Sequence, residues 1–193
     1  YLDFRPDVIQ CNDWQTALIP VVLHGEFRGS FPTTKTVFTI HNIEYQGWAN
    51  SNFNYDVLGL PPSFNDSLRY GDATNFMKAA IVTADAVSTV SETYARELQY
   101  PYYSHGMSEV LIQRAGTFFG ITNGIDTTVF DPSASPNIPF HYDVNSMAEQ
   151  KAKNKVKLQE ELGLAQDPNV PLYVIVSRLA GHKGIDLLCY ICH

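Results

Sequence analysis

Two cations near the end of the chain have a spacing that suits a diphosphate. Arg178 and Lys183 lie five residues apart, directly after the β-branched apolar run at residues 174–176. That run predicts a buried parallel strand, and the Gly-containing segment around Lys183 predicts a turn into a helix. Ligands of open α/β sheets bind at the carboxyl ends of the strands. We therefore expect Arg178 and Lys183 to neutralise the charge of a bound diphosphate.

Four other predicted strands also end in polar residues that could contact a ligand. These groups are Asn12-Asp13-Trp14, His41-Asn42, Ser91-Glu92 and Asn123-Gly124. The carboxyl ends of parallel strands meet at one edge of a sheet, so the groups should converge on one crevice. Ser, Asp and Asn also cap helices for structural reasons, so a single group would not indicate a site. Five together, counting Ser177-Arg178, predict a binding crevice.

The elements that would position these groups alternate between strand and helix along the chain. Apolar and β-branched runs predict strands at residues 6–11, 36–40, 86–90, 120–126 and 171–176. Apolar periodicity and capping residues predict helices at residues 15–23, 75–83, 91–98 and 147–162. Strands that alternate with helices predict a parallel sheet built from βαβ units, and so an α/β fold.

Local signals refine these elements. Asn12 or Asp13 could cap the helix at residues 15–23, and Ser91 should cap the helix that follows it. Pro20 lies inside the first of these helices, where it could produce a kink. Residues 48–67 show no periodicity, so we expect an irregular excursion with short helical pieces, as in many functional lids.

A proline-rich stretch divides the chain into regions. Residues 131–139 contain prolines at three positions and predict a linker. We expect residues 1–132 to be the carboxyl-terminal part of one Rossmann-like domain. Residues 133–168 would form a linker with a connecting helix, and residues 169–193 would begin a second Rossmann-like domain.

Composition excludes several classes of protein. The net charge of −7 argues against nucleic-acid binding, which needs a basic face. A few local cations would still suffice for a small phosphate-bearing ligand. No apolar run reaches the ~20 residues that a membrane span requires. The three cysteines are too few for a disulfide framework, which favours a reducing compartment.

The last five residues contain a motif that needs a separate interpretation. Cys189 and Cys192, followed by His193, have the spacing of covalent haem attachment. A cytochrome would also need a second axial ligand further along the chain. We therefore interpret the two cysteines as small core thiols on a helix, and haem or zinc binding as the alternative.

Taken in order, the motifs resemble those of bacterial glycogen synthases and plant-type starch synthases of glycosyltransferase family 5. The matching segments span nearly the whole chain, and no single motif would carry the resemblance alone. They are Pro6–Leu18 (PDVIQCNDWQTAL), Val37–Gly47 (VFTIHNIEYQG), Asn75–Ile81 (NFMKAAI), Thr89–Ala95 (TVSETYA), Asn123–Asp126 (NGID), the helix with Lys153–Lys155, and Ser177–Gly184 (SRLAGHKG).

The resemblance implies a two-domain enzyme of GT-B type with Rossmann-like sheets. Such an enzyme transfers glucose from ADP-glucose to the non-reducing end of an α-1,4-glucan, with retention of anomeric configuration. No metal or other cofactor is implied, so protein cations must neutralise the leaving diphosphate. The implied location is the cytoplasm, or the plastid for a plant-like source.

The resemblance also implies roles for individual residues. Arg178 and Lys183 would be the cations at the diphosphate, His41 would hydrogen-bond the donor glucose, and Asp13 would lie near the reacting sugar. Three further residues, Trp14, Asn42 and Asn123, would contact substrate or shape the cleft. Each could instead serve the fold: Asp13 as a helix cap, Asn123 as part of a turn, and Trp14 as cleft wall and core. We assign Tyr45 and Lys78 to packing around the site.

Three alternatives remain open from the sequence. The chain could belong to another GT-B glucosyltransferase of the sucrose or trehalose synthase type, which would differ in its donor. It could also be a non-catalytic, glucan-binding relative, or a haem protein. The resemblance places a donor-binding loop before residue 1 and an acidic residue after residue 193. We therefore expect the 193 residues to be an internal fragment that is inactive alone.

Overall fold

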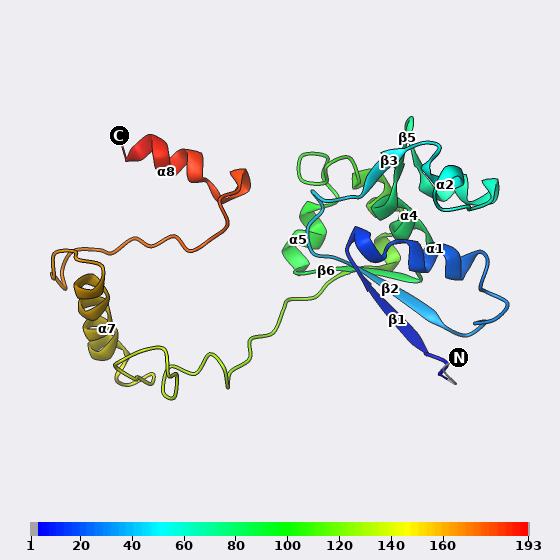
Figure 1. The fold of residues 1–193 in the computed structure, drawn as a ribbon. Coiled ribbons are helices and arrows are strands. Elements are labelled where there is room, and N and C mark those ends of the chain that lie inside the picture. Colours follow the sequence, from blue (N-terminus) through cyan, green and yellow to red (C-terminus); the bar gives the residue numbers. More distant parts are fainter. Residues whose placement is uncertain (1–3, 193) are drawn as a thin grey trace. The chain divides into compact units, whose positions relative to one another are not determined.

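The computed structural model describes residues 4–192 and divides into two compact units, residues 1–124 and residues 125–193 (Figure 1). Each unit is described by itself below. The first contains a parallel sheet with its helices, and the second contains the long amphipathic helix and the carboxyl-terminal segment. No helix in the described part of the chain is both long and apolar enough to cross a membrane.

The first unit is built on a four-stranded, all-parallel sheet. Its strands are β1 (Val8–Asn12), β2 (Lys35–Ile40), β6 (Ala86–Thr89) and β7 (Phe118–Gly120). They are arranged in the order β1-β2-β6-β7, with helices in the connections. This arrangement confirms the α/β fold and places the carboxyl ends of all four strands at one edge.

One face of this sheet is buried under the helices. Cys11, Phe38, Val87 and Phe118 form a row of neighbours across the four strands, and all are buried. The helices that share this core are α1 (Leu18–His24), α4 (Phe76–Thr83), α5 (Glu92–Glu97) and α6 (Ser108–Gln113). Right-handed crossovers between strands in this order place their connections on the same face.

The opposite face carries a polar ladder. Gln10 Nε2 donates to Thr39 Oγ1 at 3.3 Å, and Thr39 Oγ1 lies 2.8 Å from Ser88 Oγ. Val8 and Phe119, which point to the same side, are exposed. The centre of this face is buried at Thr39 and Ser88, and its exposed residues lie on the two edge strands.

A second, smaller sheet flanks the irregular excursion that we expected at residues 48–67. It contains β3 (Trp48–Asn50), β5 (Ala73–Asn75) and β4 (Arg69–Tyr70), arranged antiparallel in that order. Short helical pieces, as expected, lie between the strands: α2 (Phe53–Asp56), η2 (Pro62–Phe64) and α3 (Asn65–Leu68). The strands were missed because each is only two or three residues long.

Several predicted elements of the first unit require correction. Residues 121–126 are not a strand, since β7 ends at Gly120. The predicted helix at residues 15–23 is a turn, η1 (Trp14–Thr16), followed by α1. Pro20 is therefore the third residue of α1, in the first turn, where its missing N–H needs no partner. The prediction for Ser91 is confirmed, because its Oγ accepts the Tyr94 N–H at 3.0 Å.

The second unit contains α7 (Met147–Glu161), η4 (Gly181–Lys183) and α8 (Ile185–Ile191). Gly163, with φ 66°, follows α7 as predicted. The linker is fastened to α7 by Asn154, whose side chain bonds both the N–H and the carbonyl of Phe140. Residues 171–176 are exposed and do not form the predicted strand, because the described part of this unit offers no second strand for pairing.

A carboxylate joins β2 and β6 at their amino ends, opposite the edge where ligands are expected. Asp85 accepts hydrogen bonds from Lys35 Nζ and from the Thr36 N–H, both at 2.9 Å. Burial alone would raise the pKa of the Asp85 carboxyl, but the hydrogen bonds from Lys35 and Thr36 and the charge of Lys35 hold it below its usual value. The ionised carboxylate therefore stabilises the folded state.

We expect Asp85→Asn to destabilise the protein by about 1 kcal/mol at neutral pH, since a charge-assisted bond to backbone is lost. A depressed pKa contributes stability above the unfolded value of about 4, and that contribution disappears as the pH falls through the folded value. The difference in urea midpoint between wild type and Asp85→Asn should therefore shrink in acid. A difference that stays constant from pH 7 to pH 3 would contradict this role.

Candidate active site

The carboxyl ends of β1 and β2 bring Asp13 and His41 together. The register pairs Asn12 of β1 with Thr39 of β2, so the residues that follow each strand are neighbours. Asp13 Oδ1 accepts the backbone N–H of His41 at 2.8 Å, and the Asp13 N–H donates to the Thr39 carbonyl at 3.0 Å. These bonds continue the sheet beyond β1 and fix the Asp13 carboxylate beside the start of the next loop.

Asp13 has a strained backbone. Its φ of 56° and ψ of 178° lie in a region that is essentially restricted to glycine. Such a conformation costs about 1–3 kcal/mol and persists only where the surroundings enforce it. Here the two hydrogen bonds to the neighbouring strand enforce it. Strain of this kind is concentrated at functional sites, which makes Asp13 the strongest single candidate in this unit.

The His41 imidazole is held by a neighbour on β1. His41 Nε2 lies 3.0 Å from Asn12 Oδ1, and His41 is exposed at the sheet edge. An amide oxygen only accepts, so Nε2 donates in this pair. This bond fixes the orientation of the imidazole ring before any ligand arrives.

Side chains of the loop after His41 form hydrogen bonds with the loop's own backbone. Asn42 Oδ1 accepts the Glu44 N–H at 2.9 Å, and Gln46 Nε2 donates to the Ile43 carbonyl at 3.0 Å. Gln46 is buried and also accepts from Asn75 Nδ2 at 2.7 Å. The loop is therefore a rigid support for His41, and the Asn42 side chain forms part of that support.

Trp14 lies against the same loop. Its indole stacks on Phe76 with ring centroids 6.4 Å apart, and its ring lies close to the Cα of Gly47. A Cβ at Gly47, whose φ is 68°, would lie 2.4 Å from the Trp14 ring. Trp14 is half-buried, so the structure gives it a packing role at the wall of the site.

The third strand end contributes Ser91 and Tyr94. Tyr94 Oη accepts the Ile43 N–H at 3.4 Å, which joins α5 to the loop after His41. Burial raises the pKa of the Tyr94 phenol, and the charges of Glu97 and Asp13 act in the same direction against the hydrogen bond from Ile43. Tyr94 therefore remains a neutral hydroxyl beside the site.

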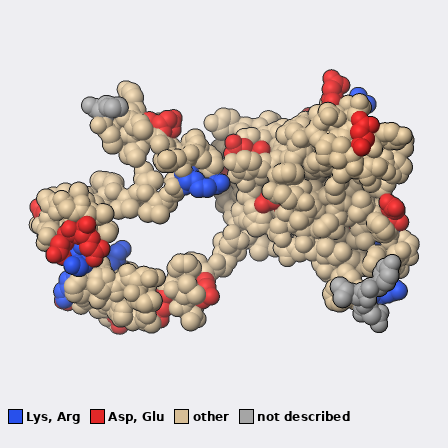
Figure 2. Space-filling model, in the orientation of Figure 1, with Lys and Arg blue, Asp and Glu red and all other residues tan. Residues whose placement is uncertain are grey.

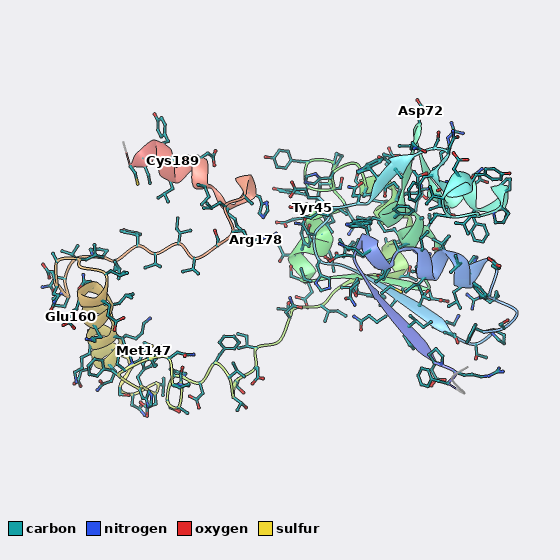
Figure 3. The ribbon with its side chains drawn as sticks, viewed as in Figure 1. Tyr45, Asp72, Met147, Glu160, Arg178 and Cys189 are labelled. Atoms are coloured by element: carbon teal, nitrogen blue, oxygen red, sulfur yellow. The ribbon has the colours of Figure 1, made fainter. Side chains whose placement is uncertain are left out.

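The remaining predicted site residues lie elsewhere in the chain. Asn123 is exposed, three residues beyond β7, and does not end a strand as we expected. Arg178 and Lys183 belong to the second unit, where the Arg178 carbonyl accepts from Ala180 N and Lys183 lies in η4 (Figure 3). Gly184, with φ 69°, then turns the chain into α8. Within the first unit, the structure thus brings together Asn12, Asp13, Trp14, His41 and Asn42.

The cysteines show no sign of a metal or haem site in the described residues. Cys189 and Cys192 are free and exposed on or next to α8, so they are not the core thiols that we expected. The reason is that the described part of this unit has no sheet to cover them. His193 of the haem motif lies outside the described residues. No three His, Cys, Asp or Glu side chains of residues 4–192 gather as metal ligands.

Comparison with known proteins identifies the family. Residues 1–113 match the starch synthase catalytic domain, which is more than half of the chain. The chain belongs to the starch synthase catalytic domain family. The glycogen synthase of Clostridioides difficile is 42% identical over 193 residues, and glycogen synthase 2 of Geobacter sulfurreducens is 48% identical over 191 residues. The matches cover 98% and 97% of this chain but only 40% and 39% of those relatives.

A solved structure of the same starch synthase family has the same fold. It is the catalytic domain of starch synthase IV from Arabidopsis thaliana bound to ADP and acarbose, with a TM-score of 0.84 and 32% identity. The match covers 96% of this chain and 39% of that one. The chain thus spans about two fifths of the length of its relatives.

Three features of the candidate site were missed in the sequence. Asn12 was predicted as a helix cap or as one of the polar residues at a strand end, whereas its side chain orients the His41 ring. Gln46 was not singled out, because two of its hydrogen-bond partners, Asn75 and His105, lie 29 and 59 residues away in the sequence. The strain at Asp13 has no sequence signal, because it arises from bonds to a strand 26 to 28 residues away.

The strain at Asp13 predicts that a glycine variant is more stable than an alanine variant at this position. Asp13→Ala loses the bond to His41 and keeps the strain, while Asp13→Gly loses the same bond and releases the strain. Glycine adds about 0.5–1 kcal/mol of unfolded-state entropy, against about 1–3 kcal/mol of strain. We expect Asp13→Gly to be about 1–2 kcal/mol more stable than Asp13→Ala in thermal unfolding. An Ala variant as stable as the Gly variant would show that the backbone is unstrained.

Proposed function

We propose that the complete protein transfers glucose from ADP-glucose to the non-reducing end of an α-1,4-glucan such as glycogen or starch, with retention of anomeric configuration. The named relatives are glycogen synthases, and the Arabidopsis relative is bound to ADP and acarbose. Both facts support a nucleotide-sugar donor and a glucan acceptor. We further propose a cytoplasmic location, or a plastid for a plant-like source, and no metal or cofactor.

The observation that carries this proposal is the fixed pair of Asp13 and His41 at neighbouring strand ends. The bond from the His41 N–H to Asp13 Oδ1, the strained Asp13 backbone and the oriented His41 ring form a preorganised polar edge. The His41 N–H bonds Asp13 Oδ1, and in the proposed complex Asp13 Oδ2 would accept a sugar hydroxyl. Groups oriented in advance stabilise a transition state without reorganisation.

In this mechanism the two groups act on the sugar. Glucosyl transfer passes through an oxocarbenium-like state, in which positive charge develops on the ring. The Asp13 carboxylate would lie near that charge or near the acceptor hydroxyl, while His41 would hydrogen-bond the donor glucose. Asn42 and Asn123 would contact the sugar side of the cleft, with Trp14 as its wall.

Arg178 and Lys183 would act on the leaving group. The bond between the sugar and the diphosphate breaks as the acceptor oxygen bonds to the same carbon, and ADP leaves with the added negative charge. A guanidinium binds phosphate oxygens through two parallel N–H bonds, and an ammonium adds a point charge. These two cations would thereby supply the charge that a metal supplies in other transferases.

Labelled-glucose incorporation into glycogen by the complete protein tests the proposal. ADP-glucose and UDP-glucose should be compared as donors at equal concentration. We expect strong preference for ADP-glucose. Preference for UDP-glucose would favour the sucrose or trehalose synthase type, and no transfer from either donor would favour a binding-only relative.

A further inference from the structure

The side chains of Asn12 and His41 meet on the polar face of the parallel sheet. Side chains alternate between the two faces along a strand, so Gln10 and Asn12 lie opposite the buried Cys11. Thr39 pairs with Asn12 and accepts from Gln10, which places Thr39 on the same face. His41 follows two residues later, directly after β2, and its Nε2 lies 3.0 Å from Asn12 Oδ1. The strand register therefore determines this pair.

The backbone of Asn12 is held from both sides. The Thr16 hydroxyl donates to the Asn12 carbonyl at 2.9 Å, and the next N–H, that of Asp13, donates to the Thr39 carbonyl at 3.0 Å. His41 is held in turn by the bond from its backbone N–H to Asp13 Oδ1. Both members of the Asn12–His41 pair are thus fixed by the fold, which preorganises the imidazole ring.

The bond to Asn12 also determines which nitrogen of His41 carries the proton. A neutral imidazole has one N–H and one bare nitrogen, and the bond made by one of them sets the state of the other. Asn12 Oδ1 can only accept, so the proton is on Nε2 and Nδ1 is bare. His41 is exposed at the strand end, and Nδ1 is the nitrogen left for a ligand. The ligand atom at that position must therefore donate.

Two acceptors at this edge of the sheet distinguish the two ends of a nucleotide sugar. Sugar hydroxyls donate, whereas the oxygens of an ionised diphosphate only accept. The bare Nδ1 of His41 and the Asp13 carboxylate would thus attract a hydroxyl and oppose a phosphate oxygen. On the face drawn in Figure 2, the charged groups of the first unit are scattered, with no gathering of Lys and Arg among its described residues. This edge accordingly suits the sugar end of the donor.

We propose that Asn12 is a positioning residue that fixes His41 Nδ1 as the acceptor for one hydroxyl of the donor glucose. This inference rests on the proposed function. Asn12 touches no substrate atom itself and acts only through the imidazole ring. It thereby contributes to the direction in which the donor binds, because the sugar end is accepted at this edge and the diphosphate end is not.

The affinities of the complete protein for analogues of ADP-glucose, measured by calorimetry without glucan, test this role. Each sugar hydroxyl is replaced in turn by hydrogen or by fluorine, neither of which donates. At one position both replacements should weaken binding equally, about three- to tenfold, the usual loss for one hydrogen bond. Asn12→Leu removes the acceptor for Nε2 and should weaken the binding of ADP-glucose by a similar factor. It should add little to the loss for those two analogues, since the same hydrogen bond is already missing.

Asn50→Leu is the matched control. Asn50 is exposed and ends β3 as Asn12 ends β1, and its Oδ1 accepts the nearby Asn52 N–H at 3.1 Å. This variant should bind ADP-glucose like the wild type. An Asn12→Leu variant that binds as tightly as Asn50→Leu would overturn the proposal. A loss in Asn12→Leu that is equally large for every analogue would also overturn it, because a merely structural role affects all ligands alike.

NMR of the complete protein with isotopically labelled histidine observes the proton on His41 directly, and His41→Gln identifies its signals. At a pH where the ring is neutral, we expect the proton on Nε2 and a bare Nδ1. A proton on Nδ1 alone would reject the role of Asn12, even where the donor binds. Wild-type protein that binds no ADP-glucose would instead reject the proposed function, and this inference with it. Should Asn12→Leu fail to fold, the wild-type spectrum and the wild-type affinities for the analogues decide.

Discussion

Replacing Arg178 or Lys183 by Ala in the complete protein should lower kcat/KM for glucosyl transfer by about 10²- to 10³-fold each, the usual loss for one oxyanion-stabilising donor. Arg178 precedes the turn η4, and Lys183 is the last residue of that turn, directly before Gly184 in its left-handed conformation. In the proposed mechanism they neutralise the diphosphate as it leaves. The loss should therefore appear largely in kcat, because the charge increases as the bond breaks.

A conservative replacement and a surface control sharpen this test. Arg178→Lys keeps the charge and loses the planar pair of donors, so it should recover only part of the activity. Lys153→Ala removes a cation from the exposed face of α7, where Lys153 pairs with Glu149, and should leave transfer unchanged. Equal activity of Arg178→Ala, Lys183→Ala and Lys153→Ala would refute the assignment of the diphosphate to these residues.

The second large effect concerns Gly120, the last residue of β7. A Cβ at this position would lie 2.2 Å from the Ser91 carbonyl oxygen and 2.4 Å from the Glu92 nitrogen and Cα. These are backbone atoms at the start of α5, and they cannot move without disturbing the Ser91 cap. We expect Gly120→Ala to destabilise the first unit by about 3 kcal/mol, at the upper end of overpacking costs.

Hydrogen exchange in the complete protein measures this effect locally. The amides of β7 and α5 should lose protection in Gly120→Ala, since both elements must separate to admit the methyl group. Gly116→Ala is the matched control, because a Cβ there meets nothing within 4 Å. Unchanged protection in Gly120→Ala would show that the close approach of β7 to α5 is not maintained in solution.

The sequence predicted two kinds of element correctly: those stabilised by residues close in sequence, and those whose pairing strand is present in the structure. Strands β1, β2 and β6 and helices α4, α5 and α7 follow from periodicity and caps, and the Ser91 cap was correct because a cap involves only neighbours in sequence. Residues 171–176 have the composition of a strand, yet they are extended and exposed. A strand needs a ladder partner, and composition carries no information about whether one is present.

The candidate site shows the same division. That Asp13 and His41 would meet followed from their positions after two parallel strands. The atoms through which they meet depend on the register of β1 and β2, which no local pattern specifies. Likewise Trp48 was placed in an irregular excursion, because its pairing with Asn75 and its packing against Tyr70 are contacts between residues far apart in the sequence. The geometry of the site therefore depends on hydrogen bonds between residues far apart in the sequence, which local sequence patterns do not specify.

The most direct test of the central claim is a structure of the complete protein with a bound, slowly reacting analogue of ADP-glucose. The account predicts that the diphosphate contacts Arg178 and Lys183 and that the glucosyl group lies beside the Asp13 carboxylate and the His41 ring. A donor bound elsewhere, with Asp13 and His41 facing no sugar, would contradict it.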